Sequence, residues 1–262
     1  MQLIDTHAHL NYKAFNKDRS EVIQRCIDNN VQVLNASSQL STSQQAVEIA
    51  RAHPGQMFAS VGFHPIHLDK KDYSIEDYQE LITNNPEQIV AVGEIGLDYY
   101  HLESDNIDEL KKRQKENFLT QLNLAQDNKL PTIIHCRDAY EDTLDILEGF
   151  SSKQEGVMHC YLGGRDIARR LISLGFYLGF TGIITFTNDE ELLSVIKEVP
   201  LAKILIETDS PYLAPQPVRG KRNEPVYVKH VAEKIAQIKN TSIEEVAVTT
   251  SENARQLFRL NF

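Results

Sequence analysis

The sequence is poor in the residues and runs that mark several large classes of protein. Its 262 residues include three cysteines, Cys26, Cys136 and Cys160, a number too small and too odd for a disulfide framework. We expect them to be small, reduced core residues. No stretch of 18 apolar residues occurs, and no basic segment followed by a long apolar one opens the sequence. The sequence therefore predicts no membrane span, no signal peptide and a cytoplasmic location.

Common phosphate-binding and nucleophile motifs are also missing. The sequence contains no G-x-G-x-x-G, no P-loop lysine motif and no G-x-S-x-G. Positive charge is scarce, since 27 Lys and Arg face 37 Asp and Glu and the net charge is −10. A protein that coats nucleic acid needs many basic contacts to phosphate, so the charge argues against that class. The acidic charge is still compatible with a few phosphate contacts in one basic pocket.

Short β-rich segments recur eight times, with helical patterns between them. Each is a continuous apolar run, which is typical of strands buried on both faces of a parallel sheet. The segments are 3–7, 31–37, 57–62, 89–94, 131–136, 156–160, 176–182 and 203–209. Between them, apolar residues recur at helical spacing, as at Phe118, Leu122 and Ala125. Gly175 is expected to cap one such helix at its C-terminus, and Thr241 with Glu244 to form a capping box before the last.

Strands that alternate with helices in this way predict an α/β fold, a (β/α)8 TIM barrel formed as a single domain over residues 1–262. Eight strand and helix pairs over about 250 residues are typical of that barrel. A doubly wound open sheet is the alternative. It more often carries a Gly-rich phosphate loop after its first strand, and here that place holds the His-Ala-His of residues 7–9.

Ionisable residues stand where most of the predicted strands end. In chain order they are His7, His9, His64, Glu94, His135, His159, Glu207 and Asp209. The carboxyl ends of barrel strands lie at one face, and a histidine at an apolar strand end is costly unless it has a partner. We therefore expect these residues to converge on one site, with Glu207 deeper in the barrel and paired to a cation. The remaining histidines are expected to be exposed or structural: His53, His67, His101 and His230.

The H-x-H pair is a weak signal alone, but its spacing suits shared ligation. On an extended segment residues i and i+2 point to the same side, so both imidazoles can reach one cation. Four histidines and two carboxylates are too many ligands for one catalytic ion that keeps an open position. Two ions about 3.5–4 Å apart, bridged by a carboxylate, would use them all. Glu94 is the expected bridge, and the ligand types accept Mg²⁺, Mn²⁺ or Zn²⁺.

Six segments closely resemble the signature segments of the TatD family of metal-dependent deoxyribonucleases. They are LIDTHAHLN (3–11), GFHP (62–65), VGEIGLDYY (92–100), IIHCRDA (133–139), MHCYLGG (158–164) and ILIETDSPYLAP (204–215), with a weaker match at ENARQLF (252–258). The resemblance implies a TIM barrel of the metal-dependent hydrolase group and 3′-to-5′ cutting of DNA ends in the cytoplasm. It also implies that two divalent ions are held at His7, His9, Glu94, His135, His159 and Asp209.

A mechanism follows as a hypothesis. A hydroxide held between the two ions attacks the phosphorus of a DNA phosphodiester, and Asp209 accepts the proton of the attacking water. His64 and Arg137 are candidates to bind the scissile phosphate, since guanidinium matches phosphate in a bidentate way. The alternatives are that His64 only packs beside Pro65 and that Arg137 pairs with Asp138.

Basic residues beyond the strand ends are candidates for DNA contacts. The loop 217–225, with Arg219, Lys221 and Arg222, follows Asp209 and is expected to reach the substrate, together with Arg165. Arg169 and Arg170 are expected to lie on a solvated helix face.

Two other classes of function compete with the nuclease. One is an amidohydrolase-type enzyme that cuts a small cyclic amide, lactone or ester on the same barrel. Such enzymes usually carry a carbamylated lysine where this sequence has Glu94. The other is a non-catalytic metal-binding or partner-binding protein that kept the fold. The complete ligand set argues against this class. Fold alone does not decide function, so the choice rests on the site.

Overall fold

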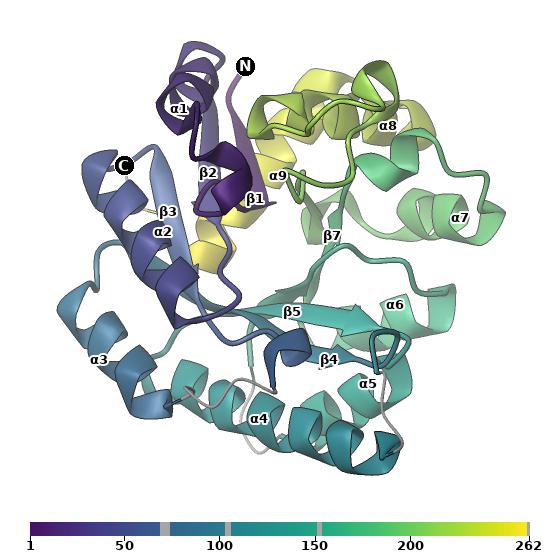
Figure 1. The fold of residues 1–262 in the computed structure, drawn as a ribbon. Helices are drawn as coiled ribbons and strands as arrows, with labels where there is room; N and C mark the ends of the chain where they lie inside the picture. The colour runs from purple at the N-terminus through teal and green to yellow at the C-terminus, as the bar shows by residue number, and fades with distance from the viewer. Residues whose placement is uncertain (69–73, 103–105, 151–153, 261–262) are drawn as a thin grey trace.

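The chain forms one sheet of parallel strands that are paired in chain order (Figure 1). The computed structural model describes all residues except 69–73, 103–105, 151–153 and 261–262. The strands within the described part are β1 (Leu3–Ala8), β2 (Val31–Asn35), β3 (Met57–Val61), β4 (Ile89–Asp98), β5 (Thr132–Arg137), β6 (Gly156–Met158), β7 (Tyr177–Phe180) and β8 (Ile204–Ile206). Each overlaps one of the eight segments predicted from the sequence.

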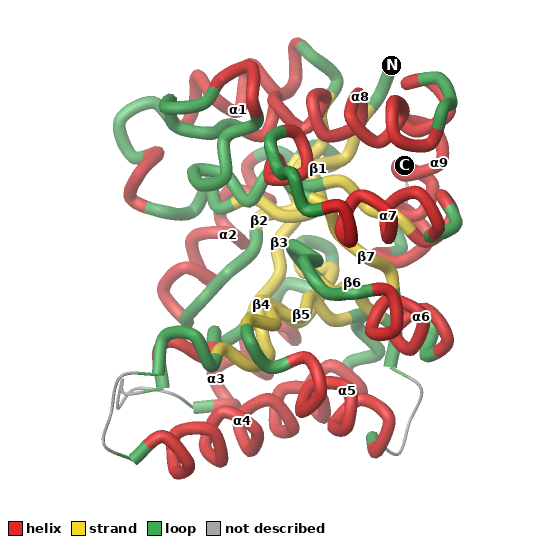
Figure 2. The backbone as a smooth tube through the Cα atoms, turned by 90° about the vertical axis from the view of Figure 1, so that its right-hand side faces the viewer, coloured by secondary structure: helices red, strands yellow, loops and turns green. Residues whose placement is uncertain are grey.

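The α-helices lie outside the strands, as Figure 2 shows. In the described chain they are α1 (Arg19–Asp28), α2 (Leu40–Ala52), α3 (Ile75–Asn84), α4 (Ile107–Asp127), α5 (Tyr140–Gly149), α6 (Arg165–Ser173), α7 (Glu190–Glu198), α8 (Val228–Lys239) and α9 (Ile243–Phe258). The predicted apolar face of α4 is confirmed, since Phe118, Leu122 and Ala125 are fully buried. Chain order therefore alternates strand and helix through β8, as a barrel requires.

The seam between the first and last strands closes the barrel. Beyond β8, Ser210 forms a parallel bridge with Ala8 of β1, and its carbonyl accepts a hydrogen bond from the N–H of His9 (2.8 Å). Deeper in the seam, the buried carboxylate of Asp5 accepts hydrogen bonds from both the backbone N–H (2.9 Å) and the hydroxyl (2.5 Å) of Thr208. The TIM-barrel prediction is confirmed, and the open-sheet alternative is excluded.

The side chains of the strands form two apolar layers. One layer faces outward and packs against the helices. The other fills the floor of the barrel, with one residue from each strand: Ile4, Leu34, Phe58, Ala91, Ile133, Val157, Tyr177 and Leu205. Helix α9 covers this floor with Ala254, Leu257 and Phe258. The interior above the floor is left for the polar strand ends.

We predict that Phe258→Ala destabilises the fold by about 3–5 kcal/mol, because it opens a cavity beneath the floor of the barrel. The side chain is 2% exposed, so little water already reaches it. Urea unfolding followed by circular dichroism measures the change. Val248→Ala is the matched control, since that side chain lies on the same helix and is 70% exposed. Equal midpoints for both variants would contradict the role given to α9.

Two predicted helix ends can be compared with the structure. Gly175 has a positive φ of 98° just beyond α6, which confirms its place at the end of that helix. The capping box assigned to Thr241 and Glu244 is wrong by one residue. The N-cap of α9 is Ser242, whose hydroxyl accepts a hydrogen bond from the N–H of Glu245 (3.1 Å). Both Thr and Ser are good N-caps, so composition alone could not choose between them.

The three cysteines are free thiols, as expected, but Cys136 and Cys160 are half-buried and not fully in the core. Cys26 is fully buried, and burial raises the pKa of its thiol to about 12. Among the described residues no helix is both long enough and apolar enough to cross a membrane.

Candidate metal centre

An irregularity in β1 points His7, and His9 just beyond the strand, into the barrel. Ile4 belongs to the floor, and strict alternation from there would turn His7 outward. The register of β1 against β2 shifts between Asp5 and Ala8. This extra residue lets His7 and His9 face the interior together, as their i, i+2 spacing predicted.

A second irregularity does the same for the carboxylates of β4. Ala91 lies in the floor, and Glu94 three positions later would face the helices in a regular strand. The register of β4 against β5 shifts between Gly93 and Ile95, and beyond it Glu94 and Asp98 share the inner side. Bulges of this kind commonly redirect side chains next to functional sites.

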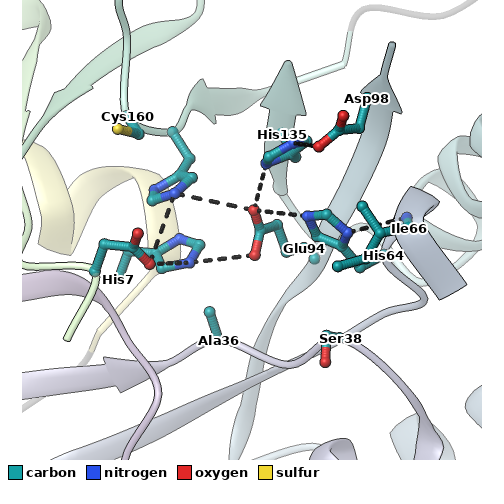
Figure 3. Close-up of polar contacts among 12 residues, drawn as sticks. His7, Ala36, Ser38, His64, Ile66, Glu94, Asp98, His135 and Cys160 are labelled. Atoms are coloured by element: carbon teal, nitrogen blue, oxygen red, sulfur yellow. Dashed lines mark hydrogen bonds and ion pairs between the residues drawn. The ribbon is translucent and has the colours of Figure 1, made fainter. Parts of the chain in front are cut away.

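Glu94 lies at the middle of the cluster (Figure 3). Its Oε2 is 3.4 Å from His7 Nε2, and its Oε1 is 2.8 Å from His135 Nδ1. The same Oε1 is 3.3 Å from His64 Nε2 and 3.9 Å from His159 Nε2. The two oxygens of Glu94 therefore face different groups of imidazoles.

Asp209 lies close to three of these histidines at the seam of the barrel. Its Oδ1 is 3.1 Å from His9 Nε2, 3.8 Å from His7 Nε2 and 4.0 Å from His159 Nε2. The Nε2 atoms of His7 and His9 are only 3.3 Å apart. The structure thus brings together all six residues that the sequence proposed as ligands, at the carboxyl ends of β1, β4, β5, β6 and β8.

Polar groups outside the cluster favour one tautomer of two of its histidines. His9 Nδ1 lies 3.0 Å from the carbonyl of Ala36, which can only accept, so this nitrogen donates and Nε2 keeps its lone pair. His159 Nδ1 lies 2.8 Å from a carboxylate oxygen of Glu207, which favours the same tautomer. In the neutral ring of each residue Nε2 keeps the lone pair and faces the carboxylates of the cluster. Such outward partners are typical of metal-binding histidines.

His135 is oriented by a carboxylate that the sequence did not single out. Its Nε2 is 3.0 Å from Asp98 Oδ2, which leaves Nδ1 to face Glu94. Asp98 is buried and also accepts hydrogen bonds from the backbone N–H (3.0 Å) and Nδ1 (2.9 Å) of His101. The position of Asp98, four residues after Glu94 on the same strand, is the signal that could have found it.

We predict that Asp98→Asn weakens divalent-ion binding about 10- to 100-fold, the usual cost of losing an outer partner of a ligating histidine. The amide offers only one acceptor oxygen, so His135 loses its fixed orientation. Competition with a fluorescent chelator measures the affinity. Asp108→Asn, at the start of α4, is the control. An unchanged affinity in Asp98→Asn would mean that His135 is not a ligand.

The donor set fits divalent cations. Two imidazole lone pairs and a carboxylate oxygen that face one another repel unless a cation or protons lie between them. Three groups each have ligand atoms within 4.8 Å of one another: His7, Glu94 and His159; His7, His9 and Asp209; and His64, Glu94 and His135. Nitrogen and carboxylate oxygen together suit Zn²⁺, Mn²⁺ and, with water, Mg²⁺.

His64 belongs to the third group by distance, but its hydrogen bonding favours another role. Its Nδ1 accepts a hydrogen bond from the N–H of Ile66 (3.2 Å), so a neutral ring carries its proton on Nε2. That N–H faces Glu94 Oε1 and can donate to it. His64 therefore fits a hydrogen-bond donor beside the cluster better than a metal ligand.

The carboxylates of the cluster stay ionised. Burial opposes the charge on Glu94, but the positive potential of His64 and His7 holds the pKa of Glu94 well below its usual range. Burial likewise opposes ionisation of Asp209, and the hydrogen bond with His9 and the charge of His159 lower the pKa of Asp209. Both groups are therefore ready to bind a cation at neutral pH.

The histidines that face two carboxylates hold protons more tightly. Burial works against protonation, yet Asp98 and Glu94 raise the pKa of His135 to about 9. Glu207 and Glu94 raise the pKa of His159 to about 10. Below these values each ring carries a second proton, which must leave before its inner nitrogen can bind a cation.

We therefore predict that metal affinity rises with pH between 6 and 8, by about tenfold per pH unit for each proton released. The sign follows from the raised pKa values of His135 and His159, because their bound protons compete with the cation. Isothermal titration at several pH values, in buffers of different ionisation enthalpy, counts the protons. In His135→Gln the slope is expected to fall by one proton. A pH-independent affinity would contradict this assignment.

Other residues around the cluster support its histidines. The ring of Tyr12 stacks on His9, with centroids 4.2 Å apart and planes inclined by 18°. Glu207 is fully buried, and its carboxylate also accepts a hydrogen bond from the N–H of Cys160 (2.5 Å). The expected cation partner of Glu207 is thus a histidine. A Cβ on Gly179 would lie 2.6 Å from that carboxylate, so glycine leaves the room that Glu207 needs.

Two of the remaining histidines have carboxylate partners. His230 pairs with Glu233 on α8, and the half-exposed His101 contacts Asp98 beside the site. Arg137 does not pair with Asp138 within the described chain. Its guanidinium lies over the ring of Tyr100, 3.9 Å from the centroid, and the residue is exposed.

The predicted basic loop is largely engaged elsewhere. Arg222 binds the carboxylate of Asp18 through both terminal nitrogens (2.8 and 2.6 Å) and packs over the ring of Phe15, so its charge is already paired within the protein. Arg219 stacks on Phe186. On α6, Arg169 lies near Glu198, and Arg170 pairs with Glu141 and Glu148, as expected of a solvated helix face. Arg165, which was expected to reach the substrate, also lies near Glu198.

Comparison with known proteins identifies relatives of the whole chain. The family described as TatD related DNase matches residues 4–259. The uncharacterized metal-dependent hydrolase YabD of Bacillus subtilis is 42% identical over 99% of this chain and 100% of its own length. The uncharacterized metal-dependent hydrolase YcfH of Escherichia coli K12 is 37% identical over 100% and 97%. The crystal structure of YJJV, a TatD homologue from E. coli, is 28% identical with a TM-score of 0.88, covering 98% of both chains.

More distant structures share the barrel alone. A dihydroorotase has a TM-score of 0.60 at 14% identity, covering 99% of this chain and 83% of its own. The whole-chain match and the identities above 30% lead to one conclusion: the chain belongs to the TatD family of metal-dependent hydrolases.

Proposed function

We propose that this protein is a deoxyribonuclease that needs divalent ions and removes nucleotides from the 3′ ends of DNA. The observation that carries the proposal is the position of Glu94, whose Oε2 faces His7 and whose Oε1 faces His135. A carboxylate with a group of ligands on either side is suited to bridge two cations. Membership of a family described as TatD related DNase supports the choice of DNA.

The proposed ligands form two sets around Glu94. His7, His9 and Asp209 form one set. His135 and His159, which both face Oε1 of Glu94, form the other, with Asp209 also near His159. Divalent ions held there would supply a nucleophile from water at neutral pH and offset the charge that develops on the phosphoryl oxygens.

The residues of this chain then have separate roles. Asp209 is the proposed proton acceptor, because its side chain is the more accessible carboxylate, 16% exposed against 6% for Glu94. His64 Nε2–H is a proposed donor to a phosphate oxygen. Arg137, at the end of β5, is the proposed guanidinium contact to phosphate.

The proposal is tested by removing the metal and restoring it. The protein is stripped with a chelator and assayed on single-stranded DNA labelled at its 3′ end, then with Mg²⁺, Mn²⁺ or Zn²⁺ added back. We expect release of labelled mononucleotide only with metal restored, and a 5′-labelled strand should shorten stepwise. Cutting within the strand would overturn the exonuclease assignment. Hydrolysis of a cyclic amide or lactone panel, without any DNA cleavage, would overturn the nuclease.

A further inference from the structure

Exposed apolar side chains gather just beyond the strand ends of the metal centre. Eight large apolar residues are well exposed in the described part of the chain, and four of them follow a site residue by two or three positions. These four, which we call the rim, are Ile66 (46% exposed), Tyr100 (59%), Leu162 (47%) and Tyr212 (55%). They follow His64, Asp98, His159 and Asp209 respectively. Their placement at four strand ends of one site argues against scattered surface residues.

Tyr212 is held at one end of the cluster. Its backbone N–H donates to the carbonyl of Asp209 (2.9 Å), and its carbonyl accepts from the side-chain amide of the buried Asn223 (2.6 Å). The ring lies edge-on to His9, with centroids 6.4 Å apart. An exposed ring on a fixed backbone is already oriented for contact with a ligand in the site.

Tyr100 is held at the other end. Asp98, which contacts His135, also anchors the following turn through the N–H of His101. The guanidinium of Arg137 covers one side of the Tyr100 ring. The two tyrosines thus belong to opposite ends of the cluster, since Tyr212 lies beside His9 and Asp209 and Tyr100 lies beside Asp98 and His135.

The charge distribution makes apolar contacts important for substrate binding. The chain carries a net charge of −10. Four of the arginines that follow β6 and β8 are paired with acidic side chains: Arg165, Arg169, Arg170 and Arg222. Their charge is already offset, so a strand entering the site gains from another source of affinity. Aromatic stacking on bases provides it without sequence preference.

We infer that Tyr212 and the Tyr100–Arg137 pair are stacking platforms for the two nucleobases on either side of the scissile phosphate. The inference rests on the proposed nuclease function and adds the groups that recognise the bases. Each ring takes one base by its π-face, and Leu162 and Ile66 lie between them on the rim. The phosphate between the two bases is then directed toward Glu94 and Asp209.

A cycle of substrate and protein changes tests the inference. Three strands are compared. One is an oligothymidylate, one carries an abasic tetrahydrofuran residue at its 3′-terminal position, and one carries that residue at the penultimate position. We expect Tyr212→Ala and Tyr100→Ala each to raise KM for the normal strand about tenfold, with kcat nearly unchanged. Each variant should show no further loss on the strand that lacks its own base. Tyr212→Phe should restore binding, because stacking needs the ring and not the hydroxyl.

Leu119→Ala is the control, since Leu119 is an exposed apolar residue on α4 away from the rim. Equal losses on normal and abasic strands, or no loss in either tyrosine variant, would overturn the platforms.

A second measurement does not depend on cleavage. An oligonucleotide with 2-aminopurine at either position is titrated with the protein in Ca²⁺, and stacking quenches its fluorescence. Quenching at one position should disappear in Tyr212→Ala and at the other in Tyr100→Ala. If no metal restores cleavage of DNA, the nuclease proposal fails, while the quenching still decides the platforms. Absence of quenching with the unmodified protein would overturn the inference by itself.

Discussion

Glu94→Gln should lower kcat for DNA cleavage by about a thousandfold or more, which corresponds to about 4 kcal/mol of lost transition-state stabilisation. The substitution keeps the shape of the side chain but removes its charge and one of its two acceptor oxygens. Because each oxygen of Glu94 faces a different group of imidazoles, a single amide cannot serve both groups. We therefore expect bound divalent ion to fall along with activity.

Metal content after dialysis, measured by inductively coupled plasma mass spectrometry, separates the two effects. Glu155→Gln is the matched control, since Glu155 is an exposed carboxylate just before β6, at the opposite end of the strands from the site. That variant should keep both full metal content and full activity. Normal turnover by Glu94→Gln with its metal retained would refute the bridging role.

Asp209→Asn should lower kcat by about 10²- to 10⁴-fold, the range typical of losing a positioned general base. Asparagine still offers one oxygen beside His9, but it cannot accept a proton. The low pKa of Asp209 keeps the native carboxylate ionised, so the acceptor is present throughout the neutral range. The loss should therefore fall mainly on kcat, and KM should change little.

The measurement pairs steady-state kinetics with metal content. Asp166→Asn on α6 is the control, because that carboxylate is exposed and distant from the cluster. If Asp209→Asn turns over normally with metal bound, another group accepts the proton. If activity is restored by raising the metal concentration, Asp209 acts as a ligand only.

Much of the fold was predictable because its signals are local. Each strand is a short apolar run, and α9 is the last in a series of amphipathic helices that flank such runs. The convergence of the ligands was predictable too, since the carboxyl ends of parallel strands share one face. His7 and His9 lie on the same side because their spacing is two, which any extended segment preserves.

Whether that side faces the barrel interior or the surrounding helices was not predictable from the sequence. Ile4 and His7 both face inward only because β1 shifts register, and Ala91 and Glu94 both do so for the same reason in β4. The pattern of apolar residues does not indicate such a register shift when all neighbouring positions are buried. Asp98 escaped notice for a related reason, as its inward direction depends on the shift that precedes it.

Charge partners across the chain were also beyond local reasoning. Arg222 looks like a DNA contact in its own loop, yet Asp18 neutralises it from more than 200 residues away. The same separation hides the pairing of Asp5 with Thr208. Contacts of this kind arise only when the barrel closes, so composition and spacing in one segment give no sign of them.

The closing seam has a consequence for how the protein is made. His9 and Asp209 are 200 positions apart, and synthesis at roughly 5–20 residues per second separates their appearance by about 10–40 seconds. During that interval β1 is not yet paired with β8, and α9 does not yet cover the floor of the barrel. The growing chain thus exposes apolar strand surface until its last helix emerges.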